Sequence, residues 1–146
     1  MNSSTLAEID AAYLAALVDR DASFRVNVER KSGGVRLLRL QVTVYFKREV
    51  TGALYLLCGD DGSYGGSFRS LKRVGSVRFR NGEANKMLVA VWPYLKNDTR
   101  RRQAQECFRF HKTQYGRGNT GVSLDDELKS IRLDVRRKLL QLAGRA

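Results

Sequence analysis

The 146-residue chain has too few cysteines and histidines for several kinds of site. Its two cysteines, Cys58 and Cys107, lie far apart without a Cys-x-x-Cys spacing, which argues against a disulfide framework or a thiolate zinc site. With His111 as its one histidine, the chain cannot supply the two imidazoles of a histidine-rich zinc site or of a histidine-metal nuclease. A catalytic site in this protein must therefore use other side chains.

Long hydrophobic runs are also missing. The apolar runs extend over a handful of residues, as in 88–92, whereas a helix needs about 18 consecutive apolar residues to cross a bilayer. The first five residues contain no basic stretch followed by an apolar core, so a secretory signal is not expected. We therefore expect an intracellular protein that is not secreted and has no membrane partner.

Acidic residues are few relative to basic ones. Asp and Glu number 15 and Lys and Arg number 27, which gives a formal net charge of +12. Such a charge attracts polyanions and raises their encounter rate, so nucleic acid is the leading candidate partner. A small basic protein of the ribosomal type is the alternative. The length suits one domain, and we expect a single folded unit over residues 1–146.

The first half of the chain alternates between helical and strand periods. Residues 5–19 open with the capping-box spacing Thr5-x-x-Glu8 and place apolar and small side chains at helical intervals, which predicts a helix. Over 23–31 and 38–46 apolar residues recur at every second position, which predicts two strands joined as a hairpin. A short helix over 50–58 is expected next.

A second hairpin and three more helices are expected in the rest of the chain. The strands of this hairpin are 67–73 and a later one that ends at Arg80, and a helix stopped by Pro93 follows. Asp98 is expected to cap the next helix, whose predicted buried face comprises Ala104, Cys107, Phe108 and His111. The last helix, 124–143, is expected to bury Leu128, Ile131 and Val135. The predicted class is therefore α+β.

Each predicted hairpin has one apolar face and one polar face. On the polar face Arg, Asn and Gln outnumber the Lys and Glu that are typical of a merely solvated strand. These side chains are the ones that hydrogen-bond base edges in a DNA major groove, so we favour recognition over a solvated surface. The polar-face residues are Arg25, Asn27, Glu29, Arg39, Gln41, Thr43, Arg69, Arg78 and Arg80.

Charged residues stand at two predicted helix ends where the helix dipole disfavours them. Asp19 and Asp21 lie at the C-terminal end of the first helix, which already carries partial negative charge. A bound divalent cation or a local arginine, Arg20 or Arg25, would offset them. The arginines at 100–102 occupy the first turn of a later helix, where a bound anion would offset their charge.

The segment Leu14 to Ala22, LAALVDRDA, closely resembles the LAGLIDADG signature of homing endonucleases. Its surroundings are similar too, since in that family the motif helix precedes a hairpin and belongs to an αββαββα unit. Residues 92–96 and then 102–104 resemble the Pro-aromatic-Leu-basic segment and the basic Gln-Ala helix of the family. The resemblance implies a core over 5–112 with an antiparallel DNA-binding sheet, followed by a C-terminal helical extension over 123–143.

The resemblance implies the activity of a site-specific homing endonuclease. The single copy of the motif resembles the branch whose members act as homodimers, which implies hydrolysis of both strands of a long pseudopalindromic DNA duplex with 3′ overhangs. Mg²⁺ is the implied cofactor, with Mn²⁺ as the alternative. The other functional hypothesis is a noncleaving protein of the same fold that assists intron splicing by binding RNA, or that regulates transcription. A prokaryotic or archaeal cytoplasm, or an organelle that encodes the protein, is the expected location.

The resemblance also implies roles for residues of the motif helix. Two such helices would pack across the dimer axis through Ala12 and Ala16, with Asp19 at the same interface, closing and bracing the helix end. Asp21 would bind the catalytic metal, and the backbone carbonyl of Arg20 would be a second ligand.

Two catalytic roles stay open between neighbouring residues. The family's water-orienting Gln falls on Phe46 or Lys47, so Lys47 is the candidate for that role. The basic residue that steadies the transition state is Lys96, counting from the proline, or Arg100, counting back from the Gln-Ala pair. In the implied complex the polar-face residues read bases or neighbouring phosphates, and residues near the hairpin tips contact the backbone: Lys31, Arg36, Lys72 and Arg73.

Overall fold

The computed structural model describes residues 3–30, 36–50, 66–70, 74–113 and 126–144. The helices are α1 (Ser3–Arg20), α3 (Gly82–Val91), α4 (Asp98–Lys112) and α5 (Asp126–Leu142), with short 3₁₀ turns η1 (Arg48–Val50) and η2 (Trp92–Tyr94). The strands are β1 (Ala22–Arg30), β2 (Arg36–Lys47), β3 (Ser67–Ser70) and β4 (Val74–Arg80). The predicted α+β class is therefore confirmed, while the helix expected over 50–58 lies almost wholly outside the described residues.

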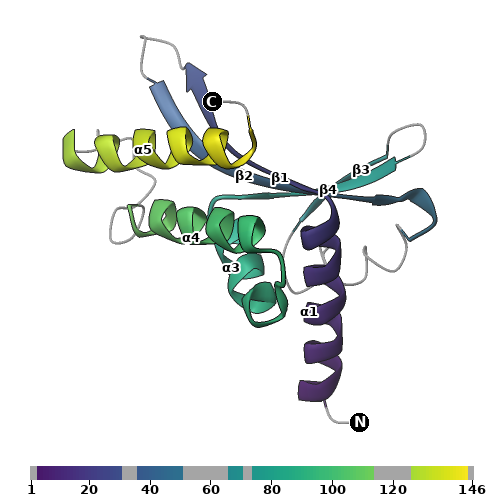
Figure 1. Ribbon diagram of the computed structural model, residues 1–146. Helices are drawn as coiled ribbons and strands as arrows, with labels where there is room; N and C mark the ends of the chain where they lie inside the picture. The colour runs from purple at the N-terminus through teal and green to yellow at the C-terminus, as the bar shows by residue number, and fades with distance from the viewer. Residues whose placement is uncertain (1–2, 31–35, 51–65, 71–73, 114–125, 145–146) are drawn as a thin grey trace.

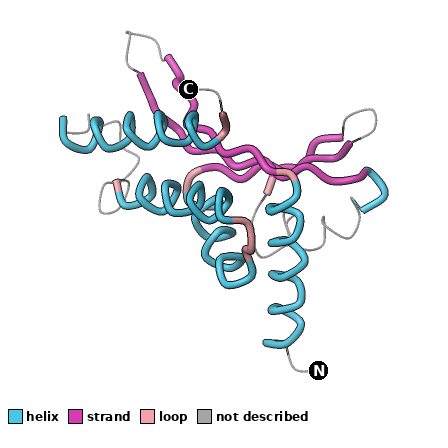
Figure 2. Tube along the Cα trace, viewed as in Figure 1, coloured by secondary structure: helices cyan, strands magenta, loops and turns pink. Residues whose placement is uncertain are grey.

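The four strands form one antiparallel sheet in the order β1-β2-β4-β3. The β1–β2 register runs from Ala22 opposite Val44 to Arg30 opposite Arg36, so the two strands pair along their whole common length. Figures 1 and 2 show α1, α3 and α4 gathered on one side of this sheet, with the C-terminal end of α1 at the strands and its N-terminus far from them. The sheet therefore keeps its other face free of these helices.

The alternation in the strands decides which face is covered. Most apolar even-numbered residues of β1 and β2, among them Phe24, Val42 and Phe46, point to the helices and are buried. They pack with α1 and α3, which bury Leu14, Val18 and Leu88 among others. Burial of apolar area is the main stabilising contribution, and in a sheet of this kind that area lies on the face that the helices cover.

Two details of the helices differ from the sequence expectation. The N-cap of α4 is Asn97, whose side chain accepts a hydrogen bond from the backbone N–H of Arg100 at 3.1 Å; Asp98 is the first helical residue instead. Asn97 takes this role because it has the extended backbone that an N-cap requires. The buried face of α4 is also turned toward α5, and comprises Gln103, Ala104, Cys107 and Phe110; Phe108 and His111 are only partly buried.

The C-terminal helix α5 packs on α4 and on the edge strand β1. It buries Val135 as predicted, but Leu139 and Arg132 are the other buried positions, and Leu128 and Ile131 are partly exposed. Arg132 lies over the ring of Phe110 at 4.9 Å and donates a hydrogen bond to the Thr113 hydroxyl at the end of α4. None of the described helices is both long enough and apolar enough to cross a membrane.

Gly75 is required where β4 passes the ring of Phe46, because a Cβ atom at this position would collide with that ring. We expect Gly75→Ala to lower the free energy of unfolding by about 1–3 kcal/mol, the usual cost of overpacking a core. Gly82→Ala is the matched control, since nothing lies within 4 Å of a Cβ there. Urea unfolding of both variants measures the difference, and equal stabilities would contradict the prediction.

An ion-pair cluster joins α4 to α5. The Asp134 carboxylate contacts Arg137 at 2.7 Å and Arg109 at 2.8 Å, and the hydrogen bonds from these two arginines lower its pKa from 3.8 to about 2. A carboxyl whose pKa is lower in the folded than in the unfolded chain stabilises the fold above its ordinary pKa of 3.8. This contribution is lost as the pH falls through about 2.

We therefore expect the thermal stabilities of the wild type and Asp134→Asn to differ most above the ordinary pKa and to converge as the pH approaches about 2. Thermal unfolding midpoints measured across this range check the prediction. Glu127→Gln serves as the control, because it removes a carboxylate of α5 that makes no ion pair with the described residues. A constant difference between wild type and Asp134→Asn at every pH would contradict it.

Candidate functional site

The two aspartates at the end of α1 have different surroundings. The carboxylate of Asp19 accepts hydrogen bonds from the backbone N–H groups of Lys96 at 2.9 Å and of Asn97 at 3.3 Å. These N–H groups stand immediately before α4, where a helix presents partial positive charge. The charge of Asp19 is therefore offset by backbone donors. This contact braces the end of α1 within one chain, and a place for Asp19 in a dimer interface stays a prediction.

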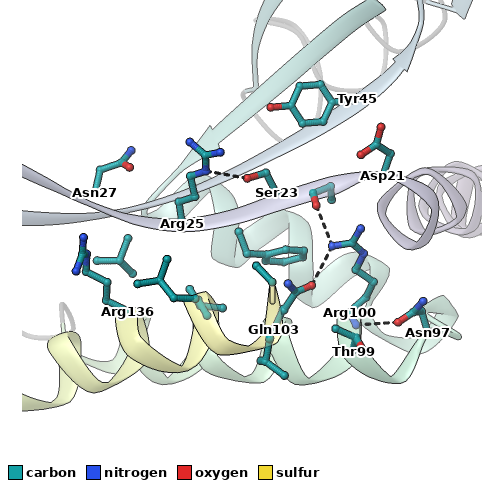
Figure 3. Close-up of a pocket in the computed structure, with 17 residues that line it drawn as sticks. Asp21, Ser23, Arg25, Asn27, Tyr45, Asn97, Thr99, Arg100, Gln103 and Arg136 are labelled. Atoms are coloured by element: carbon teal, nitrogen blue, oxygen red, sulfur yellow. Dashed lines mark hydrogen bonds between the residues drawn. The ribbon is translucent and has the colours of Figure 1, made fainter. Parts of the chain in front are cut away.

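Asp21, by contrast, is held through its backbone. Its N–H donates to the carbonyl of Leu17 at 2.9 Å, and its carbonyl accepts from the N–H of Tyr45 at 3.0 Å. Its exposed carboxylate makes no hydrogen bond or ion pair with the other residues that the structure describes, including Arg20 and Arg25. In Figure 3 the carboxylate points away from the guanidinium of Arg100. Asp21 is thus an acid at a negative helix end that is available to a ligand.

A cavity of about 580 Å³ lies beside Asp21. Its walls come from β1, from the start of α4 and from the end of α5, and Figure 3 shows the polar side chains of these elements around β1. The functional groups at its lining include Asp21, Arg25, Tyr45, Arg100, Gln103 and Arg136. Of the three basic residues considered for catalysis, Arg100 lines this cavity, while Lys96 and Lys47 are exposed and do not.

The arginines at the start of α4 are held by atoms of the chain itself. The Nη1 of Arg100 donates to the carbonyl oxygen of Ala22 at 2.8 Å and to Oε1 of Gln103 at 3.0 Å. The Nη1 of Arg101 donates to the carbonyls of Trp92 and Leu95, and its guanidinium stacks on the Trp92 ring at 4.1 Å. Carbonyl and amide oxygens and an aromatic face therefore offset part of the charge of these two cations within the chain, and the bound anion expected from the sequence stays a prediction.

The register places the nine predicted polar-face residues on the uncovered side of the sheet. Hydrogen bonds order part of this face: Asn27 of β1 donates to Gln41 of β2 at 3.1 Å, and Gln41 donates to Thr43 on its own strand at 3.4 Å. Arg39 pairs with Glu29 at 3.1 Å. Thr43 is only 6% exposed, so its hydroxyl mainly supports its neighbours in the free protein. The other polar side chains give this face a strong positive charge.

The predicted contacts near the hairpin tips are described only in part. Lys31, Lys72 and Arg73 lie outside the described residues. The backbone of Arg36 pairs with Arg30 at the far end of the β1–β2 ladder. Their contribution to binding stays a prediction.

The outer side of α1 carries small residues. Ala16 is exposed, Ala12 is half-buried, and Tyr13 is 43% exposed on the same helix. A helix with small exposed side chains lets another helix approach closely, which is the property that the dimer prediction needs.

The donor set at Asp21 can hold part of a divalent cation's coordination shell. Hard cations take oxygen ligands, and the Asp21 carboxylate and the adjacent Arg20 carbonyl are oxygens at one helix end. No group of three or more His, Cys, Asp or Glu side chains converges within the described ranges. These two oxygens are fewer than the roughly six to eight that such a cation takes, so a cation at Asp21 would need further ligands.

The lining residues that were not predicted as site residues from the sequence include Tyr45, Gln103 and Arg136. Tyr45 belongs to the polar face by strict alternation, so the strand pattern alone could have identified it as a candidate site residue. Gln103 and Arg136 depend on tertiary packing: Gln103 is 2% exposed, and Arg136 reaches the cavity because α5 docks against β1. No local sequence pattern predicts such tertiary contacts.

The fold is that of LAGLIDADG homing endonucleases. The structure of I-CvuI in complex with the I-CreI target matches with a TM-score of 0.73 and 16% identity, over 93% of this chain and 83% of that one. I-TnaI matches with a TM-score of 0.61 and 16% identity, over 92% and 95%. I-SmaMI bound to cleaved DNA matches with a TM-score of 0.65 and 14% identity over 92% of this chain, which spans only 47% of that protein. No protein-family model and no curated protein sequence matches the chain.

The opposite surroundings of Asp19 and Asp21 predict opposite effects on stability. Asp19→Ala removes the acceptor for two N–H groups, and we expect it to cost about 1 kcal/mol, as for loss of a helix cap. Asp21→Ala removes a carboxylate that has no partner within the described ranges from a negative helix end, and we expect it to raise the free energy of unfolding by about 0.3–1 kcal/mol. Denaturant unfolding at low ionic strength measures both. Equal destabilisation by the two substitutions would contradict this assignment.

Proposed function

We propose that this protein is a site-specific endonuclease that cuts both strands of double-stranded DNA. The observation that carries the proposal is the position of Asp21 at the border of a cationic sheet face, where its exposed carboxylate has no partner among the residues that the structure describes. An acid in that place destabilises the protein by itself, so selection for function explains it better than selection for stability.

The uncovered sheet face supplies the DNA-binding surface of this proposal. It carries Arg25, Arg39, Arg69, Arg78 and Arg80 with amides between them. Guanidinium groups bind phosphates and guanine edges through two parallel hydrogen bonds, and amides bind adenine edges in the same way. The same face can therefore both hold the DNA backbone and recognise the base sequence. The tip residues named above extend the contact to neighbouring phosphates. Similar folds crystallised in complex with target DNA support this assignment.

A homodimer completes the proposed enzyme. The chain spans nearly all of I-TnaI but only about half of I-SmaMI, so one copy is in keeping with half of a paired site. The small residues of α1 would pack on their counterparts across a two-fold axis, and the two Asp21 side chains would then lie near each other. The target would be long and pseudopalindromic, and cuts close together on opposite strands would leave 3′ overhangs.

The proposed cofactor is Mg²⁺, with Mn²⁺ as a substitute, held by the Asp21 carboxylate and the Arg20 carbonyl together with phosphate oxygens and the second chain. When bound, the metal would activate water and stabilise charge on the phosphate and the leaving 3′ oxygen. The structure of I-CvuI that contains 2 mM Mg and the one that contains 2 mM Ca are in keeping with a divalent ion.

Arg100 is the proposed cation beside the reacting phosphate. Its guanidinium lines the cavity that Asp21 also lines, and its Nη1 is anchored to Ala22, the residue next to Asp21. A catalytic role for Lys96 or Lys47 stays a prediction, since neither lines this cavity.

The activity can be tested without knowledge of the target. The purified protein is incubated with Mg²⁺ and a library of long random DNA duplexes, and the new ends are sequenced. We expect cuts at one family of pseudopalindromic sites with 3′ overhangs, and a loss of about 100-fold or more in rate for Asp21→Asn. Glu127→Gln, which removes an acid far from the proposed site, should cut as the wild type does.

The same samples decide between cutting and binding alone. Binding of DNA without cleavage by both the wild type and Asp21→Asn would contradict the enzyme and favour a noncleaving regulatory or RNA-binding role. The mass of the DNA complex, measured by sedimentation, should equal that of two chains on one duplex. A complex with one chain would contradict the paired-site arrangement.

A further inference from the structure

Gln103 is an unusual residue for the buried side of α4. Its neighbours on this side are Ala104, Cys107 and Phe110, whereas Gln103 brings an amide into a position that is only 2% exposed. A buried amide is unfavourable unless it is hydrogen-bonded, and an apolar side chain would fill the same space without that cost. The reason for Gln103 should therefore be found in what its oxygen binds.

The oxygen of Gln103 binds Arg100. The Nη1 of Arg100 has two hydrogens, of which one bonds Oε1 of Gln103 at 3.0 Å and the other bonds the carbonyl of Ala22 at 2.8 Å. The guanidinium carbon also lies 5.9 Å from the centre of the Phe24 ring. One corner of the planar group is thus fixed at two points, and Figure 3 shows both bonds beside the cavity.

The rest of the guanidinium is left for a ligand. Its Nε–H and Nη2–H groups make no hydrogen bond with the other residues in the described part of the chain. These donors form one edge of the fork that binds a phosphate, and a fork binds well only when its plane is held in the correct orientation.

We propose that Gln103 is a positioning residue that orients Arg100 toward the phosphate beside Asp21. This inference rests on the proposed endonuclease function and adds a residue that does not itself touch DNA. Without Oε1 of Gln103, one hydrogen of Arg100 Nη1 loses its buried acceptor, and the guanidinium keeps the Ala22 carbonyl as its one hydrogen-bonded anchor. The guanidinium of Arg100 would then no longer be held in a single orientation.

Arg101 provides an internal control for this proposal. It is also held through Nη1 by two acceptors, but both are backbone carbonyls, those of Trp92 and Leu95, and its guanidinium stacks on Trp92. A change at Gln103 should leave it untouched. Any effect confined to Arg100 therefore reports the contact with Gln103 and not a general loosening of α4.

The first test uses the free protein and the side-chain nitrogen signals of its arginines. Gln103→Met removes the acceptor and keeps a long unbranched side chain suited to a buried position, and an unchanged thermal midpoint verifies the fold. We expect rotation of the Arg100 guanidinium to become about 10-fold faster, with Arg101 unchanged. Gln103→Glu, which keeps an acceptor oxygen, should leave Arg100 restrained. Restraint of Arg100 retained in Gln103→Met, or lost in Gln103→Glu, would overturn the proposal.

The second test follows cleavage of the selected target under single-turnover conditions. Gln103→Met should lower the cleavage rate about 10-fold while the Kd for DNA stays the same, because the residue acts on orientation and not on binding. In an Arg100→Ala background the same substitution should have no further effect. Independent, multiplying losses would overturn the proposal. If the wild type does not cut DNA, the proposed function fails, and the measurement on the free protein alone decides the Gln103 contact.

Discussion

The geometry of the site depends on the carboxylate of Asp19, which joins two helix ends of opposite polarity. The C-terminal end of α1 carries partial negative charge and the N-terminal end of α4 carries partial positive charge. Asp19 belongs to the first and accepts hydrogen bonds from the N–H groups that precede the second. Residues 77 positions apart in the sequence are thereby held together, and with them Asp21 and Arg100. This contact and the hydrogen bond from Arg100 to the Ala22 carbonyl join the start of α4 to the segment that carries Asp21.

The sheet contributes the second constraint. Because β1, β2 and β4 pair without interruption along their registers, every second side chain faces the helices and every other one faces away. The covered face can therefore be apolar, while the free face can carry the polar residues proposed to bind DNA. This separation allows a protein with a net charge of +12 to concentrate arginines on the free face without placing them in the core.

The strands, the helix α1 and the motif at its end could be predicted from the sequence, because each is set by a local pattern: period two, helical spacing and nine consecutive residues. The N-cap of α4 could not be, since Asn97 and Asp98 are both good caps and only the backbone conformation separates them. The hydrogen-bond partners of Arg100 and Arg101 could not be predicted from the sequence either. They are carbonyl oxygens and an amide from distant segments, and composition shows arginines without showing what compensates their charge.

The unequal treatment of the two acids explains why a paired site is the natural proposal. The carboxylate of Asp19 accepts hydrogen bonds within its own chain, so its role is to hold α1 against the start of α4. The carboxylate of Asp21 has no partner in the described part of the chain, and Mg²⁺ prefers a nearly octahedral set of oxygens. A two-fold axis beside the exposed Ala16 would bring a second, identical carboxylate to the first, and DNA phosphates would supply further oxygens. The mutual repulsion of the two carboxylates would then oppose the empty dimer and favour the one that has bound metal and substrate.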